Sequence, residues 1–374
     1  MPSWLKEGRG SLCGANVSLL LREMGITKPL LVAGERTKNV FFARTGMRLP
    51  VFDAFHPNPD LQDCVAGAAL YQEKGCDGLI SIGGGSAMDT AKGIKALLMT
   101  DIAHVRANQL PPEGKVPHLA IPGTAGTGAE TTAVAVLYED GQKLSVDHPA
   151  LLPDGVLLDG SLLDTLPEYH RKSCAMDALA QGIESWWAKK ATPGSRIHAE
   201  RAIRGVLDNL TAYLQGDRKA QDEMLHAAYE SGVAILTTRT TAAHAMSYQI
   251  TKKLGAAHGH ACMLTLPHLW AHLAAQAEYP PMLTELSRIL GGEKPMDGAI
   301  LLKGLLAVLE LDKIPMPDDA TLDMRAASVN PERLGNHPEA LTTAQLRAIY
   351  VQAFTPMTDT ERAEAIAAWE QYGK

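Results

Sequence analysis

The sequence of 374 residues lacks several features that would assign it to particular classes of protein. Its longest apolar runs, such as Val65–Tyr71, stop well short of the roughly 18–20 residues that a membrane-spanning helix needs. It has no excess of positive charge, because 35 basic residues are outnumbered by 42 acidic ones and the net charge is −7. These absences exclude a membrane span and give a nucleic-acid partner no electrostatic support.

Cysteine is scarce, and its spacing fits no common motif. The five cysteines stand at positions 13, 64, 76, 174 and 262, and no two of them have the CxxC spacing of a redox or zinc site. The pattern predicts free thiols in a reducing compartment. The first ten residues, MPSWLKEGRG, contain no apolar stretch typical of a signal peptide, so we expect a cytoplasmic protein.

The first 160 residues alternate short apolar runs with helical patterns, which predicts a parallel sheet with right-handed crossovers. Helices are expected at residues 65–74 and 86–99. The expected strands, of which the last two form a β-rich stretch, are Pro29–Ala33, Gly78–Ile82, His118–Ile121, Val134–Tyr138 and Gly155–Leu158.

Beyond about residue 163 the pattern becomes helical throughout, with apolar residues recurring at a period near 3.6. The expected helices are 169–188, 195–214, 221–236, 267–276 and 282–290. We therefore predict two domains, an α/β domain over 1–162 and an all-α domain over 163–374.

A glycine-rich turn follows the second predicted strand, in the stretch GLISIGGGSAMDTAK. Glycines let the backbone approach a ligand closely, and the helix that follows offers unpaired N–H groups to a phosphate. The stretch is not a GxGxxG fingerprint, so a tight turn without a ligand is the alternative. The candidate cofactor-binding residues here are Gly83, Gly84, Gly85, Ser86 and Asp89.

A second loop of small residues, PGTAGTGAE, follows the third predicted strand. Its hydroxyls Thr124 and Thr127 suit a nicotinamide ribose or a pyrophosphate, although a purely structural turn is also open. Ligands bind at the carboxyl edge of open α/β sheets, so two such loops after two strands of one sheet favour a nucleotide site.

A candidate metal site comes from residues in the helical half. Asp177 and Gln181 are four residues apart, which places them on one face of a helix. His244 and His258 follow, each beside small residues. A carboxylate with two imidazoles can hold a divalent metal with open positions, but histidines in such surroundings are also common as ordinary buried polar residues.

Five motifs, in order and at matching distances, resemble the iron-type (group III) alcohol dehydrogenase family. They are GGGSAMDTAK, PGTAGTGAE, LLPDGVLLD, MDALAQGIES and AAHAMSY with AAHGHA. The resemblance covers about residues 10–290 and implies a dehydroquinate synthase-like architecture: a nucleotide-binding α/β domain, a helical domain, and a metal and a nicotinamide between them. It implies a homodimer, metal ligands at Asp177, His244 and His258, pyrophosphate contacts at Gly84–Ser86, and further cofactor contacts at Thr124, Thr127 and Lys143.

Two positions depart from the family pattern. Gln181 stands where the family has a second ligand histidine, and an amide oxygen is a weaker ligand for iron or zinc than imidazole. We expect Fe²⁺ first, with Zn²⁺ or another divalent ion as the alternative. Tyr248 stands where the family often has a proton-relay histidine, and His260 is a second candidate for that role.

The cofactor preference depends on the residues after the first strand. Where many relatives have an aspartate that grips the ribose, this chain has Gly34. Without that carboxylate a 2′-phosphate is not repelled, and Arg36 or Lys38 could pair with it. The sequence favours NADP(H), with NAD(H) as the alternative.

A narrower resemblance, carried by DALAQGIESWW, TTAAHAMSYQITKKLG and SVNPERLGNHP, is to phosphonoacetaldehyde reductases, which also carry the glutamine. It implies hydride transfer to a small aldehyde, with phosphonoacetaldehyde reduced to 2-hydroxyethylphosphonate. Arg239, set among apolar and hydroxyl residues, is the candidate for binding a phosphonate. The alternatives are a general short-chain alcohol dehydrogenase of the same family, a dehydroquinate synthase-like lyase, and a non-catalytic nucleotide-binding protein.

Overall fold

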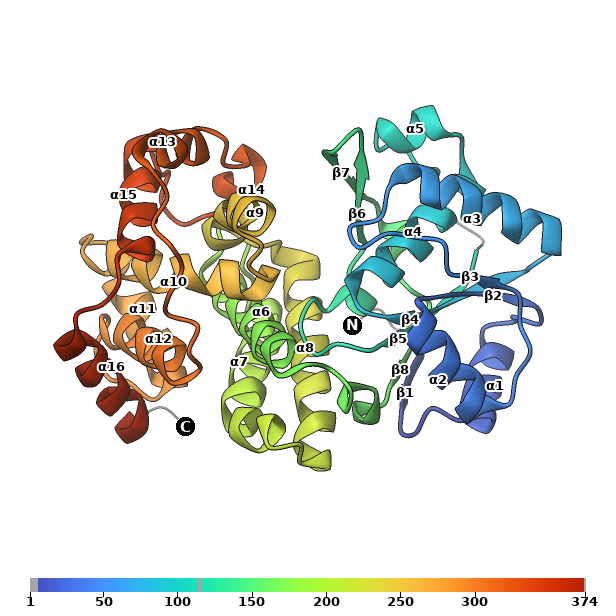
Figure 1. Cartoon of the computed structure of the whole chain (residues 1–374), viewed down its shortest axis with the longest axis horizontal. Coiled ribbons are helices and arrows are strands. Elements are labelled where there is room, and N and C mark those ends of the chain that lie inside the picture. The colour runs from blue at the N-terminus through green and yellow to red at the C-terminus, as the bar shows by residue number, and fades with distance from the viewer. Residues whose placement is uncertain (1–5, 113–115, 373–374) are drawn as a thin grey trace. The chain divides into compact units, whose positions relative to one another are not determined.

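The computed structural model describes residues 6–112 and 116–372. The chain forms two compact units, spanning residues 1–166 and 167–374 (Figure 1). The first is an α/β unit and the second is helical, so the predicted fold class is confirmed. The sequence analysis placed the domain change at residues 162–163, and the first compact unit ends at Leu166.

The first unit is built on a six-stranded parallel sheet with the order β1-β8-β5-β4-β2-β3. Its strands are β1 (Lys6–Arg9), β2 (Pro29–Ala33), β3 (Val51–Phe52), β4 (Gly78–Gly83), β5 (His118–Pro122) and β8 (Gly155–Leu158). The helices of this unit are α1 (Gly14–Glu23), α2 (Glu35–Thr45), α3 (Leu61–Lys74), α4 (Gly85–Met99) and α5 (Ile102–Arg106).

Both faces of this sheet are buried, which explains the continuous apolar runs of its strands. Side chains alternate between the faces along each strand. Leu30 and Val32 therefore pack with residues of α3 and α4, whereas Leu31 and Ala33 pack with residues of α1 and α2. Ile80 is in register with Leu31 on one side and with Leu119 on the other, which fixes the central strands.

The strand expected at Val134–Tyr138 lies outside the parallel sheet, which corrects the sequence-based prediction. It is β6 (Val134–Glu139), and it pairs antiparallel with β7 (Gln142–Asp147) in a separate hairpin. The two turn residues, Asp140 and Gly141, have φ values of 50° and 72°. This is the Asp-Gly signal of a tight hairpin, because aspartate and glycine tolerate positive φ.

The second unit is helical over its described residues. Its elements are α6 (Glu168–Trp187), α7 (Pro193–Leu214), α8 (Arg218–Thr238), α9 (Ala242–Leu254), α10 (His258–Ala274), α11 (Pro280–Leu290), α12 (Asp297–Val308), α13 (Asp319–Ala327), α14 (Pro331–Gly335), α15 (Thr343–Phe354) and α16 (Asp359–Tyr372). Helix α10 packs against α6, α9 and α12 and is buried along most of its length.

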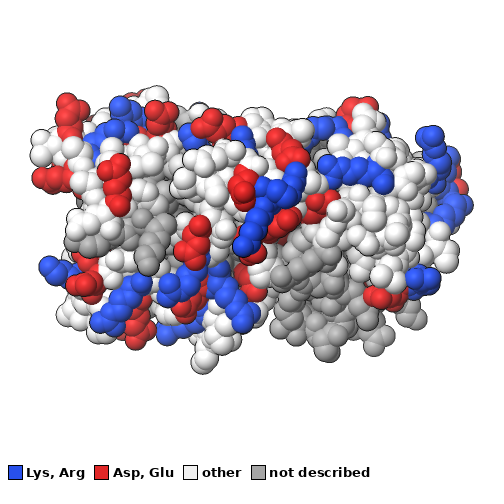
Figure 2. Space-filling view, turned by 90° about the horizontal axis from the view of Figure 1, so that it is seen from below, with Lys and Arg blue, Asp and Glu red and all other residues white. Residues whose placement is uncertain are grey.

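The surface agrees with the charge balance of the sequence. On the face drawn in Figure 2, acidic and basic side chains of the described residues lie interspersed rather than gathered by sign. Within residues 6–112 and 116–372, no helix has the length and apolar character needed to cross a bilayer.

Candidate nucleotide site and metal centre

The two predicted cofactor loops lie together at the carboxyl ends of neighbouring strands β4 and β5. Gly83 has a φ of 149°, and Gly84 caps the N-terminus of α4. A Cβ on Gly84 would lie 3.2 Å from the methyl carbon of Thr124, and a Cβ on Gly85 would lie 3.5 Å from that of Thr127. Larger residues would therefore fill the space between the glycines and the threonines.

The order of the strands in the sheet also reverses beside these loops, between β2 and β4. The chain passes from β2 outward to β3 and then returns to β4 on the other side of β2. Gly34 directly follows β2 and caps α2, so α2 and α4 both begin at the carboxyl edge of the sheet. Backbone N–H groups and the positive end of the helix dipole favour an anion there, and such a switch point is the usual dinucleotide site of open α/β sheets.

The neighbouring predicted residues have defined partners. The Ser86 hydroxyl accepts a hydrogen bond from the backbone N–H of Asn58 at 3.3 Å. Burial raises the pKa of Asp89 to about 6, although Lys92 and the backbone N–H of Val136 act to lower it. Lys143 is half-buried on β7 and interacts electrostatically with Asp89.

The charged residues at the start of α2 are paired with one another or with nearby groups. Arg36 donates a hydrogen bond to the Thr165 hydroxyl. The Lys38 ammonium lies 2.5 Å from a Glu35 oxygen and 2.7 Å from an Asp53 oxygen. A 2′-phosphate would therefore compete with two carboxylates for Lys38.

Lys92, which the sequence analysis did not identify, supports the edge of the sheet where the two loops lie. Its side chain is fully buried. The ammonium donates hydrogen bonds to Ala129 O at 2.7 Å, Val134 O at 2.9 Å and the Thr132 hydroxyl at 3.1 Å. Lys92 thus fixes the segment after the threonine loop to α4. A lysine in a helical pattern ordinarily indicates an exposed face, so the sequence alone gave no signal for this role.

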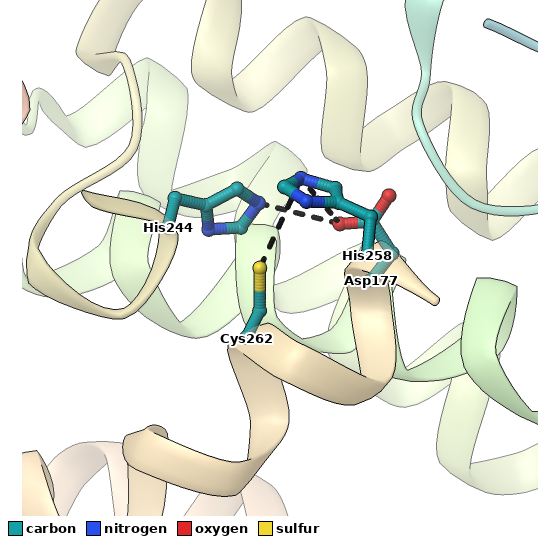
Figure 3. A group of neighbouring side chains, drawn as sticks. All are labelled: Asp177, His244, His258 and Cys262. Atoms are coloured by element: carbon teal, nitrogen blue, oxygen red, sulfur yellow. Dashed lines mark hydrogen bonds and ion pairs between the residues drawn. The ribbon is translucent and has the colours of Figure 1, made fainter. Parts of the chain in front are cut away.

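In the second unit, four donor side chains form one cluster: Asp177, His244, His258 and Cys262 (Figure 3). One donor atom from each lies within 4.8 Å of all the others. Asp177 Oδ1 is 3.3 Å from His244 Nε2 and 3.9 Å from His258 Nε2. The Cys262 sulfur is 3.9 Å from His258 Nε2. The structure thus brings together the carboxylate and both imidazoles that the sequence analysis selected, and adds a thiol that it did not.

A glycine allows this convergence. His258 is the first residue of α10, and Gly259 follows where α10 meets the backbone of α6 near Ser173 and Asp177. Because Gly259 has no side chain, the start of α10 can pack directly on α6. His258 is thereby placed beside Asp177.

Glu184, fully buried about two turns after Asp177 on α6, orients His244. One carboxylate oxygen of Glu184 contacts His244 Nδ1, which leaves Nε2 facing Asp177. The other accepts hydrogen bonds from Thr241 Oγ1 at 2.7 Å and from the Ala243 N–H at 2.9 Å, and so caps the start of α9. A carboxylate behind a ligating histidine is a frequent supporting feature of metal centres.

The cluster is strongly coupled electrostatically. Burial would lower the pKa of His258, but Cys262 and Asp177 raise it to about 9. Burial would raise the pKa of Cys262, but His244 and His258 lower it to about 7. The pKa of Asp177 is likewise lowered, since the neighbouring imidazoles outweigh the effect of burial. The acidic groups thus favour the charged forms of the imidazoles, and the imidazoles favour those of the acidic groups.

Gln181 and the two candidate proton relays lie around this cluster. The Gln181 amide oxygen accepts a hydrogen bond from the Ser231 hydroxyl at 2.8 Å. The Tyr248 ring stacks on the His258 ring with 6.2 Å between centroids. His260 is different, because Nδ1 lies 3.1 Å from the Tyr169 hydroxyl and Nε2 lies 2.8 Å from Leu311 O. Both nitrogens of His260 therefore have protein partners.

Arg239 ends α8 with a φ of 62°, a conformation that non-glycine residues seldom adopt. One of its guanidinium nitrogens donates a hydrogen bond to Leu236 O at 2.8 Å. The half-buried side chain stands on the short connection that leads into α9, the helix that carries His244.

The donor chemistry of the cluster fits a divalent metal ion. Imidazole and thiolate suit zinc and iron, and a carboxylate adds a negative charge. Buried charges of this density are ordinarily stabilised by a cation or by pairing.

Comparisons with known proteins agree with this geometry. Residues 3–160 match the family model described as iron-containing alcohol dehydrogenase, and residues 172–354 match the model for the C-terminal part of that family. The chain is 30% identical to the NAD-dependent methanol dehydrogenase of Bacillus methanolicus over 75% of this chain and 77% of that protein.

Two further similar proteins are named as aldehyde reductases. The phosphonoacetaldehyde reductase of Streptomyces viridochromogenes is 36% identical over 57% of this chain and 58% of that protein. The crystal structure of a sulfoacetaldehyde reductase from Bifidobacterium kashiwanohense in complex with NAD⁺ superposes with a TM-score of 0.86 at 25% identity, covering 95% of this chain and 97% of that one.

Proposed function

Because this chain belongs to the iron-containing alcohol dehydrogenase family of oxidoreductases, we propose that it transfers hydride between a nicotinamide cofactor and a small aldehyde. The observation that carries the proposal is the convergence of the buried Asp177 and His244 with the half-buried His258, where Asp177 Oδ1 lies 3.3 and 3.9 Å from the two imidazoles. The glycine and threonine loops of the first unit support the cofactor half of the proposal.

Each part of the chain has a role in this reaction. When bound, a divalent metal polarises the carbonyl oxygen and a nicotinamide supplies the hydride. Asp177, His244 and His258 would hold the metal, with Gln181 beside them. Glu184 keeps His244 in the required orientation.

On the cofactor side, Gly84, Gly85 and Ser86 would bind the pyrophosphate at the start of α4. Thr124 and Thr127 would complete the contacts, together with Gly34, Gly83, Asp89 and Lys143. Arg36 would stand next to the ribose at the start of α2. The Lys92 hydrogen bonds keep the threonine loop in place for these contacts.

Tyr248 is the group that we assign to proton transfer. Tyr248 lies one turn after His244 on α9, and its ring stacks on that of His258, so the residue stands beside the cluster. A tyrosine hydroxyl next to a bound cation can donate a proton to the alkoxide that forms when the aldehyde accepts hydride.

For the substrate we propose phosphonoacetaldehyde, reduced to 2-hydroxyethylphosphonate. Two relatives are named for small aldehydes that carry an oxyanion, a phosphonate in one and a sulfonate in the other. Arg239 stands just before the helix of His244, and its planar guanidinium is suited to a phosphonate.

The test is oxidation of NADPH and NADH by the purified protein with phosphonoacetaldehyde, sulfoacetaldehyde, lactaldehyde and acetaldehyde, with Fe²⁺ or Zn²⁺ supplied. We expect the highest kcat/KM with phosphonoacetaldehyde, and stoichiometric formation of its alcohol. Arg239→Met should raise KM for phosphonoacetaldehyde about 10-fold or more and leave acetaldehyde unchanged, since a charge-assisted contact contributes about 1.5–3 kcal/mol.

Arg201→Met, which changes an exposed arginine on α7, is the matched control. Equal activity on charged and uncharged aldehydes would identify a general alcohol dehydrogenase. Catalysis without net consumption of reduced cofactor would identify a lyase. The homodimer and the cytoplasmic location stay predictions, which analytical ultracentrifugation and cell fractionation would test.

A further inference from the structure

Cys262 lies within the donor cluster of Asp177, His244 and His258, although it belongs to no metal-binding sequence motif. It stands one helical turn after His258 on α10, and its sulfur is 3.9 Å from the Nε2 atom of that histidine. Its donor atom belongs to the same group as those of Asp177 and His244, all within 4.8 Å of one another. The side chain is fully buried and points into the cluster (Figure 3).

Gln181 is held in a different way. It follows Asp177 by one turn of α6, but its amide oxygen accepts a hydrogen bond from Ser231 on α8 at 2.8 Å. The side chain of Gln181 also hydrogen-bonds to Asp177, and this contact lowers the pKa of that carboxyl. An amide that donates its N–H to the carboxylate, and whose oxygen already accepts the hydrogen bond from Ser231, is placed to support Asp177.

We propose that Cys262, as a thiolate, is the fourth protein ligand of the metal, and that Gln181 is a positioning residue for Asp177. This inference rests on the proposed function for the presence of the metal, and it changes the donor set to one carboxylate, two imidazoles and one sulfur. The thiol proton leaves to solvent when the metal binds.

Charge balance supports this donor set. Asp177 with two neutral imidazoles and a neutral amide places only one negative charge in direct contact with a divalent cation, because Glu184 adds its charge only through His244. With Cys262 as a thiolate, two anionic ligands contact the cation directly. Charge that is paired at contact distance is less costly to bury, so the sulfur ligand gives the more stable centre. A soft sulfur ligand also shifts the selectivity of the centre away from Mg²⁺ and toward Zn²⁺ and Fe²⁺.

The test is spectroscopic and does not depend on catalysis. The full-length protein is stripped with a chelator and loaded with one equivalent of Co²⁺ under anaerobic conditions. We expect a sulfur-to-cobalt charge-transfer band in the near ultraviolet. Cys262→Ser should lose this band and weaken metal binding about 100-fold or more, which exceeds the 10–100-fold expected from loss of a supporting residue. Gln181→Ala should keep the band, and Cys76→Ser, which removes a thiol of the first unit, should change neither property.

A second measurement covers the case in which Cys262→Ser does not fold. X-ray absorption of the zinc-loaded wild-type protein should show one sulfur neighbour at about 2.3 Å. A stoichiometric metal with no sulfur neighbour and no charge-transfer band would overturn the assignment, whatever the activity. A sulfur-bound metal in a protein that reduces no aldehyde would uphold it and would instead count against the proposed function.

Discussion

Gly259 and Asp177 are in such close contact that no side chain fits between their helices: a Cβ on Gly259 would lie 2.6 Å from the Asp177 amide nitrogen and 2.0 Å from Ser173 O. Gly259→Ala should therefore push α10 away from α6 and destabilise the protein by about 3 kcal/mol, the upper range for overpacking. Urea unfolding measures this change, and bound metal should fall with it. Gly335→Ala, with nothing within 4 Å of the added atom, is the control and should be neutral.

Glu184→Gln should weaken metal binding about 10–100-fold, because the amide cannot stabilise the orientation of His244 as the carboxylate does. Competition with a coloured chelator measures the affinity. Glu200→Gln removes an exposed carboxylate that pairs with Arg204 and should have no effect on it. Equal affinities for wild type and the Glu184 variant would show that His244 is oriented by its helix alone.

Glu130 should make the protein less stable as the pH rises. Burial raises the pKa of Glu130 from 4.5 to about 7, and its Oε1 has no hydrogen-bond partner among the described residues. A carboxyl whose pKa is higher in the folded protein costs stability as the pH rises through the window between the two values. The free energy of unfolding of Glu130→Gln, relative to wild type, should thus increase by about 2–3 kcal/mol between pH 4.5 and 7.

Urea denaturation at several pH values measures this difference. The exposed Glu23→Gln on α1 is the control for removing a surface carboxylate. A difference for Glu130→Gln that stays flat with pH would mean that the Glu130 carboxyl ionises normally in the folded protein.

The double variant Glu35→Gln with Asp53→Asn should shift cofactor preference toward NADPH. Lys38 contacts both carboxylates, so their removal leaves its charge available to a 2′-phosphate. The ratio of kcat/KM for NADPH to that for NADH should rise about twofold to fivefold, as is usual for exposed charge pairs. Arg106→Gln, whose partner Glu139 lies elsewhere in the unit, should leave the ratio unchanged. No change in the double variant would place the ribose away from Lys38.

The sequence predicted those parts of the fold that depend on local pattern. The apolar runs 29–33, 78–82 and 118–121 are strands of the parallel sheet, because both faces of that sheet are buried and period-2 alternation is absent. The start of α10 was not predicted. Pro267 was taken as a helix start, but the helix runs through it from His258. A helix buried on nearly every side can retain a proline that an isolated helix would not tolerate.

The same limit applies to the candidate sites. His244, His258 and Asp177 were selected from motifs, and the structure brings them together. Cys262 and Glu184 were missed, although each lies on the same helix as a selected ligand and at helical spacing from it. Their roles depend on which helix faces which, and a single sequence does not contain that information. Lys92 was missed for the opposite reason, because its burial contradicts the usual behaviour of lysine.

The buried donor cluster has a consequence for how the protein responds to its surroundings. Its donors come from three helices, so an unfolded chain offers the ion only scattered side chains. A ligand that binds only the folded form stabilises it by about 4 kcal/mol when its free concentration is 1,000 times the dissociation constant. The melting temperature should therefore follow the supply of metal, and a starved cell would lose the enzyme to proteolysis as well as to inactivity.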